Sequence, residues 1–120
     1  MELHIDHIGD LAVVECQGRI FPNDDAFRLR DTVLSQAESS GIILDLSQVY
    51  ALGDSVLFMM VRLHRWAEEH HVDLRFFNPT SFVRDTFEEN GFAGELPTDN
   101  SLEQVFAMLP RQRLPVTHAA

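Results

Sequence analysis

Apolar and polar residues alternate along the chain with two different periods, and the changes of period predict its elements. Residues 2–7 and 11–18 alternate at every second position, which is typical of β-strands, and the Gly-Asp pair between them predicts a tight hairpin. Residues 42–46 are apolar almost throughout, as expected for a strand that is covered on both faces. Residues 73–77 predict a further strand, which an Asn-Pro pair ends.

Helical spacing and helix-capping residues mark four other segments. Asn23 or Asp24 begins the first predicted helix, and Gly41 stops it. Asp54 or Ser55 begins the second. The predicted helices cover residues 24–39, 54–69, 81–90 and 101–108, and residues 95–97 predict a short edge strand.

The resulting order of elements is β-β-α-β-α-β-α-(β)-α. Alternation of strands and helices implies parallel neighbours joined by right-handed crossovers, here preceded by one antiparallel hairpin. The sequence therefore predicts an α/β fold with a four- to five-stranded mixed sheet and about four helices, on one face or on both. We expect a single domain over residues 1–109 and a loosely packed C-terminal tail over residues 110–120.

The helix predicted for residues 54–69 is unusual because its first two turns are apolar nearly all round. A helix that packs on one sheet needs only an apolar stripe. We therefore expect some of its apolar side chains to face outward, unless the helix is more central in the fold. The side chains in question are Val56, Phe58, Met59 and Met60.

The start of that helix is where the sequence predicts function. N–H groups in the first turn of a helix lack intrahelical partners and carry partial positive charge. The carboxylate of Asp54, or a phosphate on Ser55, would be stabilised there. The simpler alternative is that Asp54 or Ser55 is only the N-cap of the helix.

The formal charge of −10 narrows the choice of partners. Nucleic acid and anionic membrane surfaces should repel such a chain, whereas a basic protein surface should attract it. No apolar run is long enough to insert into a membrane, and the N-terminus lacks the pattern of a signal peptide. The single cysteine, Cys16, fits a reducing compartment, so we expect a cytoplasmic protein.

No constellation of residues predicts catalysis, a metal or a cofactor. The six histidines are scattered, and their spacing does not bring imidazole groups together on a strand or helix. Cys16 lacks the surroundings of a nucleophile and is better explained as a small buried apolar residue. We therefore expect no enzyme activity and no cofactor.

Five phrases in register resemble the STAS domain, the fold of sulfate transporters and anti-sigma factor antagonists. Together they cover roughly residues 3–109, and they imply the STAS fold for the predicted sheet and helices. The phrases are Gly18-Arg19-Ile20, Ile43-Leu44-Asp45-Leu46-Ser47, Gly53-Asp54-Ser55-Val56-Leu57, residues 74–78, and Phe87 with Asn90-Gly91-Phe92.

The resemblance implies a phosphorylation site, from which this chain departs. In the family, a partner kinase typically phosphorylates the first serine of an Asp-Ser-Ser/Ala-Gly-Leu phrase. Counted without gaps from Ser47, that serine falls on Asp54, the family aspartate on Gly53 and the family glycine on Val56. Asp54 would then supply a fixed negative charge in place of the phosphate. One extra residue in the preceding loop would instead make Ser55 the acceptor.

The favoured hypothesis is a non-enzymatic anti-sigma factor antagonist that binds a histidine-kinase-like anti-sigma factor acting as a serine kinase. The alternative is an accessory STAS subunit that docks on a transporter ATPase, and a small-ligand sensor or enzyme is a weaker third. An exposed apolar patch at the helix start could equally serve a homodimer. The predicted partner-binding residues are Asn23, Asp24, Gly53, Asp54, Ser55, Phe58 and Met59.

Overall fold

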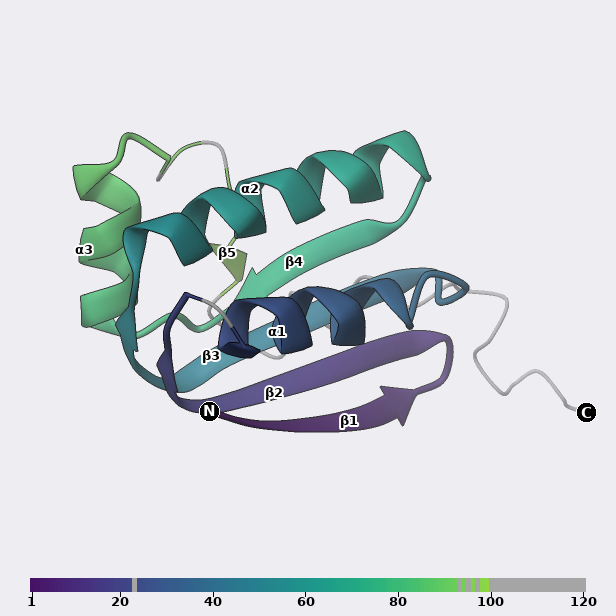
Figure 1. Ribbon diagram of the computed structural model, residues 1–120. Coiled ribbons are helices and arrows are strands. Elements are labelled where there is room, and N and C mark those ends of the chain that lie inside the picture. The colour runs from purple at the N-terminus through teal and green to yellow at the C-terminus, as the bar shows by residue number, and fades with distance from the viewer. Residues whose placement is uncertain (23, 93, 95, 97, 100–120) are drawn as a thin grey trace, which may run out of the picture.

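The computed structural model describes residues 1–22, 24–92, 94, 96 and 98–99. Strands and helices alternate along this part of the chain after an initial hairpin (Figure 1). In chain order they are β1 (Glu2–Ile8), β2 (Leu11–Ile20), α1 (Asp24–Leu34), β3 (Gly41–Leu52), α2 (Asp54–Glu69), β4 (Asp73–Phe77), α3 (Ser81–Glu89) and β5 (Thr98–Asp99).

The sheet confirms the predicted α/β fold. Its five strands lie in the order β1-β2-β3-β4-β5, with β1 antiparallel to β2 and every other pair parallel. Of the edge strand predicted for residues 95–97, only Leu96 is described, and the strand lies instead at Thr98–Asp99, beside Phe76 and Phe77. The helix predicted for residues 101–108 and the tail over residues 110–120 lie outside the described residues, and the single domain over residues 1–109 stays a prediction.

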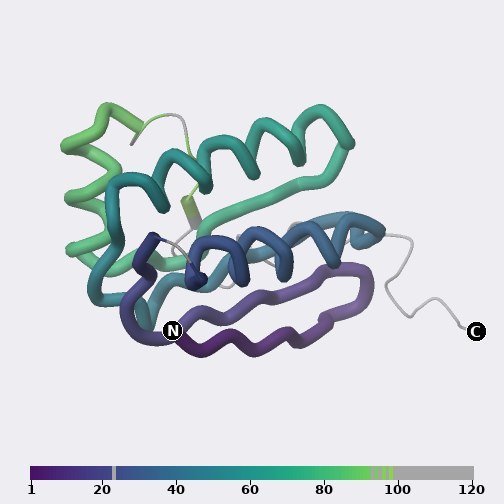
Figure 2. The backbone as a smooth tube through the Cα atoms, viewed as in Figure 1, coloured from purple at the N-terminus to yellow at the C-terminus, as the bar shows by residue number. Residues whose placement is uncertain are grey.

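Two of the three described helices lie over one face of the sheet, and the third lies at one end of it. Figures 1 and 2 show α1 and α2 side by side over the same face, with α3 across the end of the sheet where β3 leads into α2. The strands follow one another across the sheet in chain order, and right-handed crossovers then bring successive helices to the same face. The sequence left open whether the helices lie on one face or on both, and for α1 and α2 this strand order gives one face.

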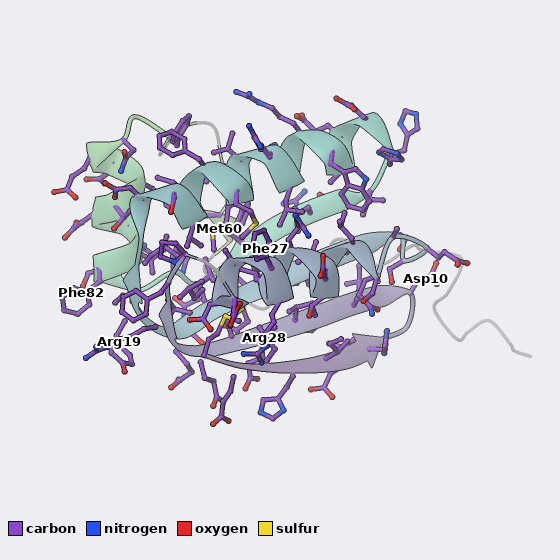
Figure 3. All side chains as sticks on the ribbon, in the orientation of Figure 1. Asp10, Arg19, Phe27, Arg28, Met60 and Phe82 are labelled. Atoms are coloured by element: carbon purple, nitrogen blue, oxygen red, sulfur yellow. The ribbon has the colours of Figure 1, made fainter. Side chains whose placement is uncertain are left out.

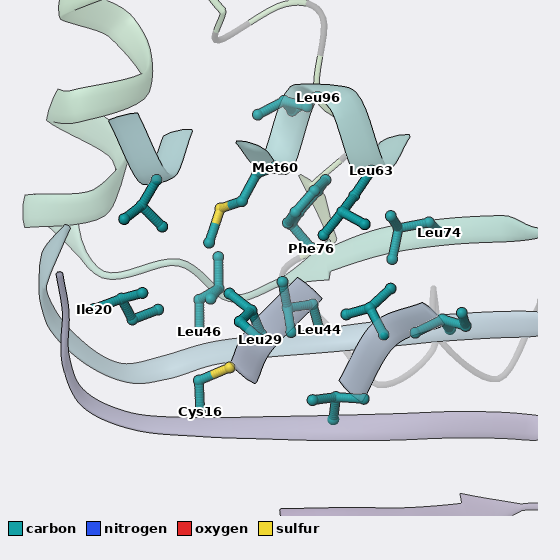
Figure 4. Packing of buried hydrophobic residues seen from close by; sticks show 14 of the residues in the cluster. Cys16, Ile20, Leu29, Leu44, Leu46, Met60, Leu63, Leu74, Phe76 and Leu96 are labelled. Atoms are coloured by element: carbon teal, nitrogen blue, oxygen red, sulfur yellow. The ribbon is translucent and has the colours of Figure 1, made fainter. Parts of the chain in front are cut away.

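One hydrophobic core lies between the helices and the sheet (Figure 4). Alternate residues of the central strands point into it, because side chains along a strand alternate between faces. Leu11 and Ile43, at the intervening positions, form a second small cluster with Val13 and Phe77. The start of β3 is thus buried on both faces, as predicted for residues 42–46. The strand residues of the main core are Ala12, Val14, Cys16, Ile42, Leu44, Leu46, Leu74 and Phe76.

Strand β3 is much longer than the sequence predicted. The predicted strand ended at residue 46, but residues 47–50 continue it and pair with the end of β2. β3 contains one more residue than β2 at two places, first at residues 46–47 and again at Tyr50. Each bulge leaves one residue of β3 without a partner in β2 and bends the strand. The carboxylate of Asp45 fixes the first one, since it accepts hydrogen bonds from the Ser47 N–H at 2.9 Å and the Ser47 hydroxyl at 2.7 Å.

Helix α1 is shorter than predicted. It ends at Leu34 instead of near residue 39, and Gly41 begins β3 instead of stopping the helix. The residues between form turns, in which the Ser35 hydroxyl donates to the Thr32 carbonyl at 2.6 Å and the Gln36 N–H donates to the Val33 carbonyl at 3.0 Å. Serine side chains compete in this way with the helical hydrogen bonds, which explains the early end.

Candidate functional site

Helix α2 begins directly where β3 ends, with Gly53 as the only residue between them. Gly53 is the N-cap, in an extended conformation (φ −74°, ψ 149°), and no side chain caps the helix. The Gly53 N–H donates to the Ile20 carbonyl at 3.2 Å, so the end of β2 fixes the helix start. The expectation that Asp54 or Ser55 is merely the N-cap is therefore wrong.

The contact between Gly53 and Pro22 explains why a glycine occupies the N-cap. A β-carbon at position 53 would lie 3.2 Å from Cδ of Pro22, which is closer than ordinary van der Waals contact. The aspartate that the ungapped count places here in the family would crowd the proline. The Phe-Pro pair after β2 was the only local signal, and nothing in the local pattern linked that pair to Gly53.

Asp54 and Ser55 lie exposed in the first turn of α2. Asp54 is well placed for its charge, since a carboxylate is stabilised at a helix N-terminus. One of its oxygens accepts a hydrogen bond from the Asn90 side-chain amide at 3.5 Å, which connects the start of α2 with the end of α3. Both candidate acceptor positions are accessible to a partner.

The outward-facing residues of α2 are only partly those expected. Phe58 is 50% exposed and Met59 is half-buried, whereas Val56 and Met60 are fully buried. The helical period explains this, because residues 56, 57, 60 and 61 face the core and residues 58 and 59 lie beside them. The Phe58 ring meets Phe92 edge-on, with 5.6 Å between the ring centroids.

Further exposed aromatic residues, from elements other than α2, lie at the same end of the molecule as the start of α2. Phe21 and Tyr50 are about half exposed, and the Arg19 guanidinium lies 6.0 Å and 5.5 Å from the centroids of their rings. Arg19 and Phe82 lie at the same end of the molecule in Figure 3. We call the exposed group at this end the α2-start surface; its residues are Phe21, Tyr50, Asp54, Ser55, Phe58 and Phe82.

Sequence reasoning missed part of this surface. Phe21 and Tyr50 lie between the predicted elements, and only the pairing of β3 with β2 makes them neighbours of one arginine. Of the predicted partner-binding residues, Ser55, Phe58 and Met59 line one groove with Pro22. Asp24 is exposed at the start of α1, and Asn23 lies outside the described residues.

Cys16 is buried in the core, as the sequence indicated. Burial raises the pKa of its thiol from 9.0 to about 12, with further contributions from the negative charges of Asp45 and Glu15. The neutral thiol is a poor nucleophile, because the thiolate is the reactive form. Within residues 1–22 and 24–92 and the few described beyond them, no three His, Cys, Asp or Glu residues are grouped to hold a metal ion.

No described helix combines the length and apolarity needed to cross a bilayer. A comparison with curated proteins found no match to this chain.

Several solved structures share the fold. SpoIIAA, an anti-sigma factor antagonist, in its unphosphorylated form aligns with a TM-score of 0.74 at 14% identity, over 88% of this chain and 95% of its own. An anti-sigma factor antagonist from Mycobacterium paratuberculosis gives 0.73 at 16% identity, over 88% and 91%. The Bacillus cell fate determinant SpoIIAA in its phosphorylated form gives 0.69 at 13% identity, over 90% and 100%. At these identities the likeness shows a common fold.

The sequence itself matches a family model. That model describes the STAS domain, and the match extends over residues 2–105, which includes every described strand and helix. Because this match covers most of the chain, the chain belongs to the STAS domain family.

Proposed function

We propose that this chain is a non-enzymatic regulatory protein of the anti-sigma factor antagonist type, which binds a protein partner through the α2-start surface. One observation carries the proposal. Asp54 and Ser55 are exposed in the first turn of α2, and neither side chain is needed to cap the helix. The partner is an anti-sigma factor that is also a serine kinase, and both act in the cytoplasm.

The aromatic residues around the helix start support a protein partner. Exposed aromatic side chains that surround a polar centre are typical of interaction surfaces, where a few aromatic anchors carry most of the binding energy. Phe21, Tyr50 and Phe58 are each about half exposed, so a partner can still bury much of their area. SpoIIAA, which has been solved in unphosphorylated and phosphorylated forms, has the same fold and supports a phosphorylation-linked role.

Two alignments of the acceptor position remain, and the structure bears on both. In the ungapped alignment Asp54 takes the acceptor position and supplies a permanent negative charge at the helix N-terminus. The shifted alignment needs one extra residue between Ser47 and the helix, and no loop is present there. The bulge at Tyr50 shows that the end of β3 can hold a residue without a partner in β2, so an added residue here would not need a loop.

Mass spectrometry of the protein recovered from its native cells tests the proposal. The wild type, Asp54→Ser, Ser55→Ala and the double variant should be compared. Phosphate that is present on the wild type and lost in Ser55→Ala identifies Ser55 as a working acceptor. Phosphate only on variants that contain Asp54→Ser places the replaced acceptor at position 54, with the kinase still recognising the site. A chain that is never modified in any of the four forms contradicts a kinase partner.

The departures from the family phrase favour one second candidate, docking on a transporter ATPase without phosphorylation. Gly53 fits against Pro22 and Val56 is fully buried, so these replacements are built into the packing. Tagged wild type and a Phe58→Asp control should be purified from native cells. A soluble kinase lost in the control supports the first function, and an ATPase–transporter complex lost in the control supports the second.

A further inference from the structure

The two edge strands of the sheet differ in length and regularity. β5 forms one edge with two residues, whereas β1 forms the other with seven. β1 pairs with β2 from Glu2 to Ile8 without a bulge, and it contains neither proline nor glycine. Figure 1 shows it at the margin of the sheet, beyond β2. A long, regular edge strand offers its outward N–H and C=O groups for pairing with another strand.

The side chains of β1 divide between the two faces of the sheet. Leu3, Ile5 and His7 share the face of the helices, since each lies opposite a core residue of β2. The intervening side chains point to the other face. Two of these, His4 and Asp6, are exposed and have no hydrogen-bond or ion-pair partner within the part of the chain that the structure describes. Both are therefore available to a second chain.

Two antiparallel copies of β1 overlap along their full length in only one register. In this register Ile5 lies opposite Ile5 of the second copy, on a two-fold axis perpendicular to the sheet. His4 then lies opposite Asp6 of the second copy, and the symmetry produces this pair twice. An imidazole N–H can donate to a carboxylate whether the histidine is neutral or charged. Cross-strand pairs of this kind stabilise a sheet.

The neighbouring registers bring acidic side chains together. A shift of the second copy by two residues in one direction places Asp6 opposite Asp6, and a shift in the other direction places Glu2 opposite Asp6. Like charges directly opposite one another destabilise a strand pair. The chain has a formal charge of −10, so self-association requires a contact that places no acidic side chains opposite each other. The full-length register meets this requirement, because Glu2 lies opposite Ile8.

We propose that β1 is the docking surface for a second copy of this chain, which pairs with it in the full-length antiparallel register. The product is a two-fold symmetric dimer with one continuous sheet and the helices of both copies on the same face. One pair of strands makes a small interface, so the dimer forms reversibly. The interface uses no residue of the α2-start surface. This dimer therefore goes beyond the proposed function and does not depend on it.

Disulfide crosslinking of the purified protein tests the register. Ile5→Cys and Ile8→Cys are matched variants, because both side chains are 40% exposed on the same strand. The two copies of position 5 lie directly opposite, with Cα atoms about 4.5–5.5 Å apart, which is within disulfide range. The two copies of position 8 lie roughly 20 Å apart. Mild oxidation should therefore give a covalent dimer only from Ile5→Cys, since Cys16 is buried.

Sedimentation velocity with exchanged side chains tests the pair of His4 with Asp6. The wild type should pass from monomer to dimer as its concentration is raised to about 1 mM. His4→Asp places acidic side chains opposite each other twice and should weaken the dimer roughly tenfold. The double variant His4→Asp/Asp6→His restores the pair with its members exchanged, so it should recover most of the affinity. His71→Asp makes the same change outside β1, after α2, and should leave the affinity unchanged.

Three results would overturn the β1 dimer. They are a wild type that stays monomeric throughout, equal crosslinking of the two cysteine variants, and a double variant that associates as weakly as His4→Asp. A dimer that survives His4→Asp but is lost in Phe58→Asp lies at the α2-start surface instead. Thermal unfolding of each variant checks that the fold is intact. Because these experiments use the purified chain alone, their failure leaves the proposed regulatory function untouched.

Discussion

The two helices that follow β3 and β4 begin in opposite ways. Helix α3 begins at Thr80, whose hydroxyl accepts from the Val83 N–H at 3.4 Å and donates to the Val49 carbonyl at 2.6 Å. Helix α2 begins at Gly53, which has no side chain and is held by its backbone N–H alone. One threonine side chain thus caps α3 and ties it to the sheet, and no side chain does this for α2.

The aromatic residues of the two helices repeat this contrast. Phe87 of α3 is 2% exposed and stacks edge-on with Phe76 at 6.2 Å, whereas Phe58 of α2 is 50% exposed. The contrast holds for this pair and not for every aromatic residue of the two helices, since Phe82 of α3 is 65% exposed. A side chain that serves packing cannot serve a partner, so Phe58 remains available for binding and Phe87 does not.

The largest expected effect comes from truncating the aromatic residue of each helix. Phe87→Ala should lower the free energy of unfolding by about 3–5 kcal/mol, because it opens a cavity in the core. Phe58→Ala should lower the free energy of unfolding by at most about 1 kcal/mol, because half of the ring is already exposed to water. Urea denaturation of the two variants measures both values. Equal losses would mean that Phe58 is part of the core and would remove the contrast.

The free energy of unfolding, measured over a series of alkaline pH values, tests the burial of Cys16 in the sheet beneath both helices. Burial holds the pKa of Cys16 near 12 in the folded chain against 9.0 ordinarily. Below pH 9 the Cys16 thiol is protonated in both the folded and the unfolded chain. Above pH 9 the unfolded chain loses this proton while the folded chain keeps it, which favours unfolding. Stability should therefore fall by up to about 1.4 kcal/mol per pH unit between pH 9 and 12.

Cys16→Ala is the control for that series, since it keeps a small apolar residue and removes the titration. Its unfolding free energy should lack the part of the slope that belongs to the thiol. Trp66 emission follows α2, and far-ultraviolet circular dichroism follows all helices. Coincident transitions indicate one cooperative unit, and an earlier change in emission would show that α2 separates from the sheet on its own.

A smaller effect than the loss of Phe87 should come from removing the cap of α3. Thr80→Val keeps the shape of the side chain but removes both hydrogen bonds of the hydroxyl, and should cost about 1–2 kcal/mol. Thr80→Ser retains the hydroxyl and should cost less than half as much. Thermal melting distinguishes the two. If valine is tolerated as well as serine, the hydroxyl is not what holds the start of α3, and the contrast with Gly53 loses its basis.

Local patterns predicted the elements well, and distant pairing explains what they missed. The bounds of α2 and β4 match the predictions, because each has a continuous pattern and a clear breaker at its end. The end of β3 was missed because its polar residues are strand residues only through pairing with β2. The N-cap at Gly53 was missed because Pro22, which requires it, is distant in sequence.

The residues of the candidate site also fall into two groups, those that local patterns indicate and those that only distant pairing brings together. Asp54, Ser55 and Phe58 could be found from the sequence, because capping residues and an all-round apolar helix start are local signals. Phe21 and Tyr50 could not, because a bulge in β3 and the end of β2 bring them to the same arginine. The outward positions within the apolar start of α2 depended on the helical phase, which only the packed core fixes.

The burial of Cys16 also makes the molecule well suited to chemical labelling. It is the only cysteine of the chain and is shielded from reagents in the folded state. A cysteine introduced by Ser55→Cys would therefore be the single reactive thiol, ready for a photo-crosslinker or a spin label. Whatever contacts the start of α2 in the cell could be trapped there covalently and located residue by residue.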